Sequence, residues 1–381
     1  MLAITNATIL TGLGNILENA TLVLNNGKIE NLGFSISIPS NYEVIDATGK
    51  YITPGLIDVH THLGVHEEGI GKEGHDFNET TSATPTHVRA LDGINPREKG
   101  FDFARKAGVT TVQIMPGSAN VLGGEMVVLK TIPTTIVDEM ILLEPSGMKA
   151  AFGENPKKVH GSKGKFPETR MGVAALFREQ LVQAQNYLDK KRKNNETERD
   201  LKMENLAKVL TGKMPIRAHA HRADDIVTVL RLRKEFDIDI TIEHCTEGHL
   251  IADFLAKQEV RVSVGPTMSS RSKVETSNKG WETLYSLAEA GVAFSLTTDH
   301  PVVSIDYLWT SVIHAVKHGI TEELALKSVT LHAAKHLDLD DRIGSLEIGK
   351  DADVTIWSGN PFDLRSHVEK TIINGTVVYQ Q

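Results

Sequence analysis

The chain has 381 residues, of which 40% are hydrophobic and 24% charged, so it can bury the core of one large barrel with additions or of two domains. Its net charge of −8 argues against nucleic acid or an anionic membrane as the main partner. No apolar run reaches the ~20 residues of a membrane helix, and the N-terminus lacks the parts of a signal peptide, so we expect a soluble, cytoplasmic protein.

Both ends of the chain are rich in predicted strands. Residues 1 to about 50 alternate short apolar runs with turn signals such as Asn25-Asn26-Gly27, which predicts a small antiparallel sheet. The last forty residues show the same pattern, with a second hairpin turn at Asn374-Gly375. Two β-rich ends around a different middle predict that the termini pair into one small domain.

The middle of the chain opens with a short apolar run, Leu56–Val59, which follows the turn at Pro54-Gly55 and predicts a buried strand. Because side chains alternate across a strand, His60 and His62 leave the same face and can chelate one metal ion. The alternative is two unrelated loop histidines.

Strands and helices then alternate. The predicted strands cover 109–112, 137–143, 147–152, 216–221, 238–245, 260–264 and 292–298. The predicted helices cover 97–106, a long region from 169 to 211, then 224–236, 248–257, 281–290, 306–318 and 321–334. About eight strands separated by helices are typical of a parallel (β/α)8 barrel, in which the chemistry lies at the carboxyl ends of the strands. The segment Pro116–Gly124 is read as a tight backbone turn.

Candidate metal ligands fall at those strand ends. His219 and His221 end one predicted strand, His244 ends the next, and Asp299 ends the last. Imidazole and carboxylate from several strands form the ligand set that a zinc-type ion prefers. Each residue also has an ordinary alternative, either a hydrogen-bonded core histidine or an acidic helix cap. The single cysteine, Cys245, is expected to be buried and inert rather than nucleophilic, and it excludes an internal disulfide.

The segments Ile52–His62 and Arg342–Val354 resemble the first barrel strand and the closing segment of the amidohydrolase superfamily, in particular of its imidazolonepropionase-related branch. The resemblance implies an α/β fold, with a (β/α)8 TIM-like barrel over residues 53–341. Residues 1–52 and 342–381 would be the two parts of a small β-sandwich. It also implies a metal-dependent hydrolase that cleaves a carbon–nitrogen bond of an amide or cyclic amide.

Carried over by position, the resemblance assigns His60, His62, His219, His244 and Asp299 to the metal, with Asp299 also moving the proton and His244 either binding metal or contacting the substrate. His221 would lie behind the ligands or face the substrate, although His219 and His221 could exchange roles. Lys149 stands where relatives with two metals use a carboxylated lysine as a bridge. The alternative is an ordinary lysine paired with Glu154, so one or two Zn²⁺ ions are implied.

The substrate is expected to be a small molecule. The resemblance indicates a cyclic amide such as an imidazolone or hydantoin, or else a dipeptide with a C-terminal imino or basic residue. Glu154 and Arg222 are further candidates for contact with the substrate. A non-catalytic barrel scaffold is the rival from another class, but such proteins typically lose ligands that are present here. Neither nucleic acid nor membrane is expected as a partner, and a homo-oligomer is left open.

Overall fold

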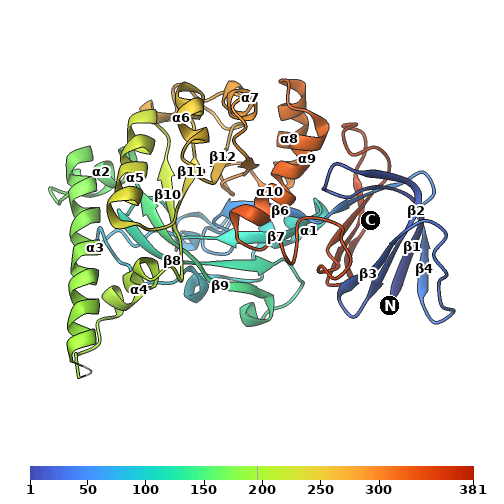
Figure 1. The fold of residues 1–381 in the computed structure, drawn as a ribbon, viewed down its shortest axis with the longest axis horizontal. Helices are drawn as coiled ribbons and strands as arrows, with labels where there is room; N and C mark the ends of the chain where they lie inside the picture. The colour runs from blue at the N-terminus through green and yellow to red at the C-terminus, as the bar shows by residue number, and fades with distance from the viewer. Residues whose placement is uncertain (195) are drawn as a thin grey trace.

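The computed structural model describes residues 1–194 and 196–381 and shows a mixed α/β fold built on two eight-stranded sheets. Both chain ends lie in the sheet at one end of the molecule, and most helices lie over the other sheet (Figure 1). We refer to the two as the terminal sheet and the barrel sheet.

The terminal sheet joins the first and last segments of the chain. Its strands are β1 (Leu2–Leu10), β2 (Ile16–Asn25), β3 (Lys28–Gly33), β4 (Glu43–Asp46), β5 (Tyr51–Pro54), β14 (Val354–Trp357), β15 (Val368–Ile373) and β16 (Thr376–Gln380). The antiparallel pairing of β5 with β14 connects the two halves, so the predicted pairing of the termini is confirmed.

The two predicted hairpin turns of the terminal sheet are also confirmed. Asn26 and Gly27 connect β2 to β3 with φ angles of 48° and 76°, and Asn374 and Gly375 connect β15 to β16 with 50° and 73°. Two consecutive residues with positive φ form the turn whose twist matches antiparallel strands, and Asn-Gly adopts it at low cost.

The barrel sheet has the order β13-β12-β11-β10-β9-β8-β7-β6. Its strands are β6 (Leu56–Thr61), β7 (Val109–Ile114), β8 (Leu122–Lys130), β9 (Ile141–Ala151), β10 (Ile216–Ala220), β11 (Ile240–His244), β12 (Val262–Val264) and β13 (Phe294–Leu296). The two edges approach each other where the backbone N–H of His62 donates to the carbonyl oxygen of His300 at 2.9 Å, so the sheet forms a nearly closed barrel.

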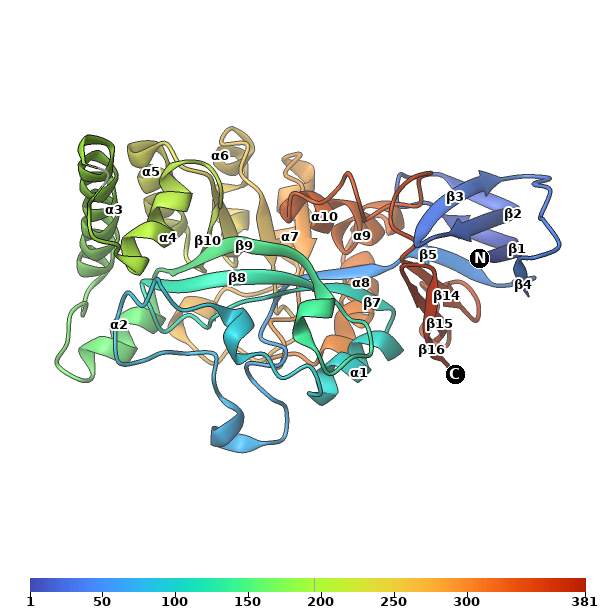
Figure 2. The ribbon, with the colours of Figure 1, turned by 90° about the horizontal axis from the view of Figure 1, so that it is seen from below.

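One prediction about this sheet was wrong. Strand β8 runs antiparallel to both β7 and β9, whereas a parallel sheet with intervening helices was expected. The connection from β7 to β8 spans only residues 115–121, and a parallel crossover needs a dozen or more residues. The two long strands β8 and β9 lie side by side in Figure 2.

Two local predictions for the same region were also wrong. Gly123 and Gly124 lie inside β8 rather than in a tight turn, and residues predicted as two strands form a single one, β9, preceded by a short 3₁₀ helix. Gly124 has a φ of +117°, and a Cβ there would lie 2.5 Å from the carbonyl oxygen of Val88. The glycine therefore permits a close backbone approach inside the strand.

The predicted helices are found in order, but the helix at 154–161 was not predicted, and the regions predicted at 169–211 and 321–334 each contain two helices. The α-helices are α1 (Lys99–Lys106), α2 (Glu154–Gly161), α3 (Arg170–Lys193), α4 (Leu201–Leu210), α5 (Ala223–Phe236), α6 (Ala252–Ala256), α7 (Glu282–Glu289), α8 (Leu308–Lys317), α9 (Glu322–Ser328) and α10 (Leu331–His336). Short 3₁₀ helices are η1 (Gly71–Gly74), η2 (Ala90–Gly93), η3 (Val137–Met140), η4 (Gly248–Ile251), η5 (Val274–Thr276) and η6 (Ile305–Tyr307). Among the described residues, no helix combines the length and apolar character that a membrane crossing requires.

Candidate active site

A cavity of about 360 Å³ lies beside the carboxyl ends of β6, β10 and β11. Seven residues singled out from the sequence line it: His60, His62, Lys149, His219, His221, His244 and Asp299. Strand ends that are far apart in the chain meet here, since neighbouring strands of the barrel are aligned in register, as Ala220 is with His244.

The first group of potential ligands consists of His60, His62 and Asp299. The Asp299 Oδ1 atom lies 3.2 Å from Nε2 of His62 and 3.6 Å from Nε2 of His60. Burial raises the pKa of Asp299, but the neighbouring imidazoles of His62, His244 and His60 outweigh it and hold the pKa well below its usual range. The carboxylate is therefore ionised at neutral pH.

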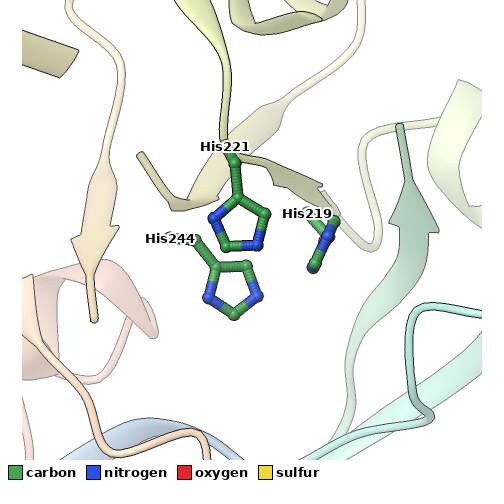
Figure 3. Close-up of side chains that lie close together, drawn as sticks. All are labelled: His219, His221 and His244. Atoms are coloured by element: carbon green, nitrogen blue, oxygen red, sulfur yellow. The ribbon is translucent and has the colours of Figure 1, made fainter. Parts of the chain in front are cut away.

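The second group consists of His219, His221 and His244, shown in Figure 3. The rings of His221 and His244 stack with centroids 4.6 Å apart and an interplanar angle of 20°. The His219 ring stands edge-on, with its centroid 4.4 Å from that of His244. In each of the two groups, the potential ligand atoms lie within 4.8 Å of one another.

Hydrogen bonds on the far side of the rings orient these histidines. The Nδ1 atoms of His62 and His244 lie 2.8 Å from the carbonyl oxygens of Met115 and Gly265. Because a carbonyl oxygen only accepts hydrogen bonds, Nδ1 of both rings carries the proton, and Nε2 presents its lone pair to the cavity. Nδ1 of His221 lies 2.7 Å from the Thr246 hydroxyl, which orients this ring as well.

One further observation indicates that the site fits a metal ion. His219 is only 3% exposed, yet neither of its ring nitrogens has a hydrogen-bond partner within the described residues. A buried polar atom without a partner is costly, and an ion between the three rings would satisfy it. Burial lowers the pKa of His219, His221 and His244 well below the usual value and that of His60 to about 4. Neutral imidazole is the form that binds metal.

Lys149 is fully buried on β9. Its Nζ lies 3.2 Å from Nε2 of His60 and 3.0 Å from Sδ of Met115, and burial lowers its pKa to about 8. The expected alternative partner, Glu154, lies at the start of α2, where its backbone N–H donates to Glu275. Lys149 therefore lies among the ligands, with no ion pair to Glu154 among the described residues.

The structure does not bring Glu154 and Arg222 into the cavity lining. The guanidinium of Arg222 is paired with the Asp224 carboxylate two residues later, at 2.9 and 3.0 Å. Cys245 is buried, and burial raises the pKa of its thiol to about 12, so the expected inert thiol agrees with the structure.

Sequence reasoning missed the buried carboxylate Glu243. It accepts hydrogen bonds from the hydroxyls of Thr241 (2.7 Å) and Ser263 (2.6 Å) and lies 2.9 Å from Nε2 of His336. Its Oε2 atom also lies 3.2 Å from Nδ1 of His60, so it orients that ring from behind. Alternation along the strand that ends at His244 was the signal, because it places Glu243 on the inner face with Thr241.

Glu275, in η5, was also missed. It is 1% exposed, and its Oε1 atom lies 3.7 Å from Nε2 of His219 and 3.8 Å from Nε2 of His221. That oxygen has no hydrogen-bond partner among the described residues. It lies in a loop with no periodic pattern, so no sequence signal connected it to the histidines.

Comparisons with known proteins extend over nearly the whole chain. A family model described as "Amidohydrolase family" matches residues 51–378. The crystal structure of an amidohydrolase from Thermotoga maritima MSB8 is similar over 100% of both chains, with 42% identity and a TM-score of 0.97. An imidazolonepropionase from Brevibacillus brevis is 25% identical over 96% of this chain and 91% of its own length. The amidohydrolase tasK of Hapsidospora irregularis is 27% identical over 96% of this chain, which spans 40% of that relative's length.

Proposed function

This chain belongs to the amidohydrolase family, and from that premise we propose that the two histidine-rich groups in its cavity hold the metal with which it hydrolyses a small amide. The enzyme class, a metal-dependent hydrolase of carbon–nitrogen bonds, follows from the family. The identity of the metal, the roles of the residues and the substrate are our proposals.

The observation that carries the proposal is the convergence of two ligand groups on one cavity. His60, His62 and Asp299 would hold one ion, and His219 and His244, with His221 beside them, would hold a second. Imidazole nitrogens with few carboxylates are a donor set that suits Zn²⁺. When bound, such an ion polarises the scissile carbonyl and lowers the pKa of water from 15.7 to about 7.

Asp299 would carry the proton. Its ionised carboxylate, which lies 3.2 Å from Nε2 of His62, would accept the proton of the attacking water and then deliver it to the leaving nitrogen. Glu243 positions His60 during this step, because a ring fixed by a carboxylate keeps its other nitrogen directed at one point.

Lys149 would connect the two groups as a carboxylated lysine. A pKa of about 8 leaves a fraction of the amine neutral at neutral pH, and a neutral amine adds CO₂ with loss of a proton to become a carbamate. The anionic oxygens would then lie between the two cations. In the alternative, Lys149 stays unmodified and the centre holds one ion.

A cyclic amide such as an imidazolone or hydantoin is our first candidate substrate, supported by the similarity to a named imidazolonepropionase. A dipeptide with a C-terminal imino or basic residue is the second. A cavity of about 360 Å³ suits either, because it is at the small end of ligand sites.

We also propose that the nearly closed sheet is a variant (β/α)8 barrel over residues 53–341. Residues 1–52 and 342–381 would form the β-sandwich, with the junction close to Gly55, between β5 and β6. A cytoplasmic location would agree with the single cysteine.

The test is a screen of the metal-loaded protein against cyclic ureides, dipeptides and N-acyl amino acids, with the chelator-treated protein as the control. We expect hydrolysis of at least one class that is lost with the metal and restored by Zn²⁺. If the purified protein contains no stoichiometric metal and hydrolyses nothing after reconstitution, the result would support the non-catalytic barrel scaffold instead.

A further inference from the structure

One wall of the cavity comes from a single segment, the loop of residues 265–281 between β12 and α7. Its cavity-lining residues are Pro266, Ser269, Ser270, Ser272, Lys273, Thr276 and Lys279. Two of them are lysines, whereas Asp299, which belongs to the first ligand group, is the only acidic residue among the described residues that line the cavity. The loop wall therefore adds positive charge to the cavity, which Glu275 of the same loop compensates only in part.

Lys279 is the best-defined of these charges. It is 8% exposed, and its Nζ donates to the Ser269 hydroxyl at 2.6 Å and to the Ser270 carbonyl oxygen at 3.0 Å. Both partners are neutral, and an ammonium group has three donors. Among the described residues, no carboxylate lies within ion-pair distance of it, and a buried charge without a counter-ion is costly. One donor direction is left for an anion.

The loop holds this ammonium group in place before any ligand arrives. The Arg271 guanidinium donates to the Lys279 carbonyl oxygen through Nε at 3.1 Å and Nη2 at 2.7 Å. The Thr276 hydroxyl, at the end of η5, accepts from the backbone N–H of Lys273 at 3.2 Å and donates to its carbonyl oxygen at 2.9 Å. A preformed site binds its ligand with little ordering cost.

Lys273 is a secondary charge. Its side chain is 35% exposed, and its Nζ lies 3.9 Å from the Glu275 carboxylate, which already compensates part of its charge. Asn155 and Asn78, which also line the cavity, are neutral: the Asn155 amide donates to the Ser118 hydroxyl at 2.7 Å, and the Asn78 side chain accepts from the backbone of Ala119 at 3.0 Å. Away from Lys149 and the proposed metal ligands, an anionic group in the cavity is thus attracted to the Lys279 side.

We infer that the substrate carries a carboxylate that binds the Lys279 ammonium group, with Lys273 beside it, while the scissile amide lies at the histidines. A single donor direction from a single buried ammonium group suits a monoanion better than a phosphate dianion. The inference rests on the proposed function, since it defines the substrate class of the same cavity. It assigns Lys279 to substrate specificity rather than to metal binding or proton transfer.

The experiment compares matched pairs of compounds on the zinc-loaded enzyme. Each acid, whether an N-acetyl amino acid, a dipeptide or a cyclic ureide with a carboxylate side chain, is paired with the same molecule bearing a primary alcohol instead. We expect kcat/KM for the acid to exceed that for the alcohol by about 10- to 100-fold, the scale of one charged hydrogen bond. Lys279→Met should reduce that ratio to within about 3-fold, mainly by raising KM for the acid, and Lys279→Arg should restore part of it.

Lys257→Met is the matched control, because Lys257 is exposed at the end of α6 and should keep the wild-type ratio. If Lys279→Met does not fold, as judged by its thermal unfolding, Lys279→Gln replaces it, since its amide can keep the bond to Ser270. If Lys279→Met loses kcat/KM equally on the acid and the alcohol, the inference is overturned. A wild-type enzyme that does not prefer the acid would also overturn it.

Failure of the proposed function can be distinguished from failure of the carboxylate site. If no compound is hydrolysed, the proposed substrate classes fail, and the binding of the same pairs is measured by calorimetry on the zinc-loaded protein. Tighter binding of an acid than of its alcohol, lost in Lys279→Met, still supports the carboxylate site. No such preference in any pair overturns it.

Discussion

The histidines of the site are positioned by what lies behind them. Carbonyl oxygens of Met115 and Gly265 and the carboxylate of Glu243 hold the far nitrogens of His62, His244 and His60. The opposite nitrogens of His60 and His62 face Lys149 and Asp299, and in His219 both nitrogens lack partners among the described residues. At the scale of single residues the site is thus arranged for ligands that the protein itself does not supply.

The first prediction concerns metal content. His60→Ala and His219→Ala each remove one ligand from a different group, and an incomplete site typically loses several kcal/mol of metal affinity. We expect both variants to lose metal and activity, measured by elemental analysis after dialysis. His249→Ala, outside the cavity lining, is the control. Full metal content in both ligand variants would contradict the assignment.

The second prediction concerns Lys149. If it is carboxylated, the protein should bind two ions, and reconstitution with bicarbonate should raise activity. Lys149→Ala should then bind about one ion, with partial rescue by short carboxylic acids. An intact mass that shows unmodified lysine in a fully active protein, with one ion bound, would remove the bridge and leave a mononuclear hydrolase.

The third prediction concerns Asp299. Asp299→Asn keeps the shape and one oxygen but removes the base, so we expect near-normal folding and a kcat lower by on the order of 10²-fold or more. If Asp299 were only a helix cap, the variant would instead lose about 1 kcal/mol of stability and keep its kcat. Kinetics on the substrate found by the screen, together with thermal unfolding, separate the two.

At the scale of elements, β8 departs most from the regular pattern. It pairs antiparallel on both sides, and its Gly124 approaches the Val88 backbone, next to the bridge that joins Arg89 to Glu125. The loop that carries Arg89 is thereby attached to the barrel sheet. Gly124, one of two glycines in this nine-residue strand, is explained by this close approach, not by a turn.

The fourth prediction tests that contact. In Gly124→Ala the new Cβ would lie 2.5 Å from backbone at a φ of +117°, so both strain and collision oppose it. Gly49→Ala is the control, because Gly49 also has a positive φ, 75°, but no atom within 4 Å. We expect Gly49→Ala to lose about 1 kcal/mol and Gly124→Ala clearly more in urea unfolding. Equal losses would mean that the collision relaxes freely.

At the scale of the whole molecule, a buried charge cluster connects the two sheets. Lys130 at the end of β8 is 4% exposed. Its Nζ lies 2.7 Å from the carboxylate of Asp351 and 3.1 Å from that of Asp353, and it also bonds the Asn374 side chain in the hairpin turn. Lys28 from the terminal sheet pairs with the same Asp351 at 2.6 Å.

The fifth prediction removes the centre of this cluster. Lys130→Met keeps the buried stem but leaves Asp351 and Asp353 without their shared cation, and breaking a buried pair costs about 3–5 kcal/mol. We expect a loss of that order in urea unfolding, whereas Lys106→Met, at an exposed position in α1, should change stability by less than about 0.5 kcal/mol. A similar effect for both would mean that the cluster does not stabilise the junction.

The sequence by itself determined the features that depend on local pattern. Alternation placed His60 with His62, strand ends indicated His219, His244 and Asp299, and Asn-Gly pairs marked both hairpins. These follow from the two-residue period of a strand and from the backbone freedom of particular residues, which neighbours in the chain are enough to define.

Only the tertiary structure decided the direction of β8 and which loop residues reach the cavity. Lys279 lines the cavity and Glu275 lies next to His219. Both belong to a loop without periodicity, so their positions depend on how residues 265–281 pack against the rest of the barrel. Arg222 shows the converse. It directly follows His221 in the sequence, but its guanidinium pairs with Asp224 at the surface instead of reaching the cavity. Local pattern fixes the face of a strand on which a side chain lies, whereas the long-range packing of loops determines which charges share a cavity.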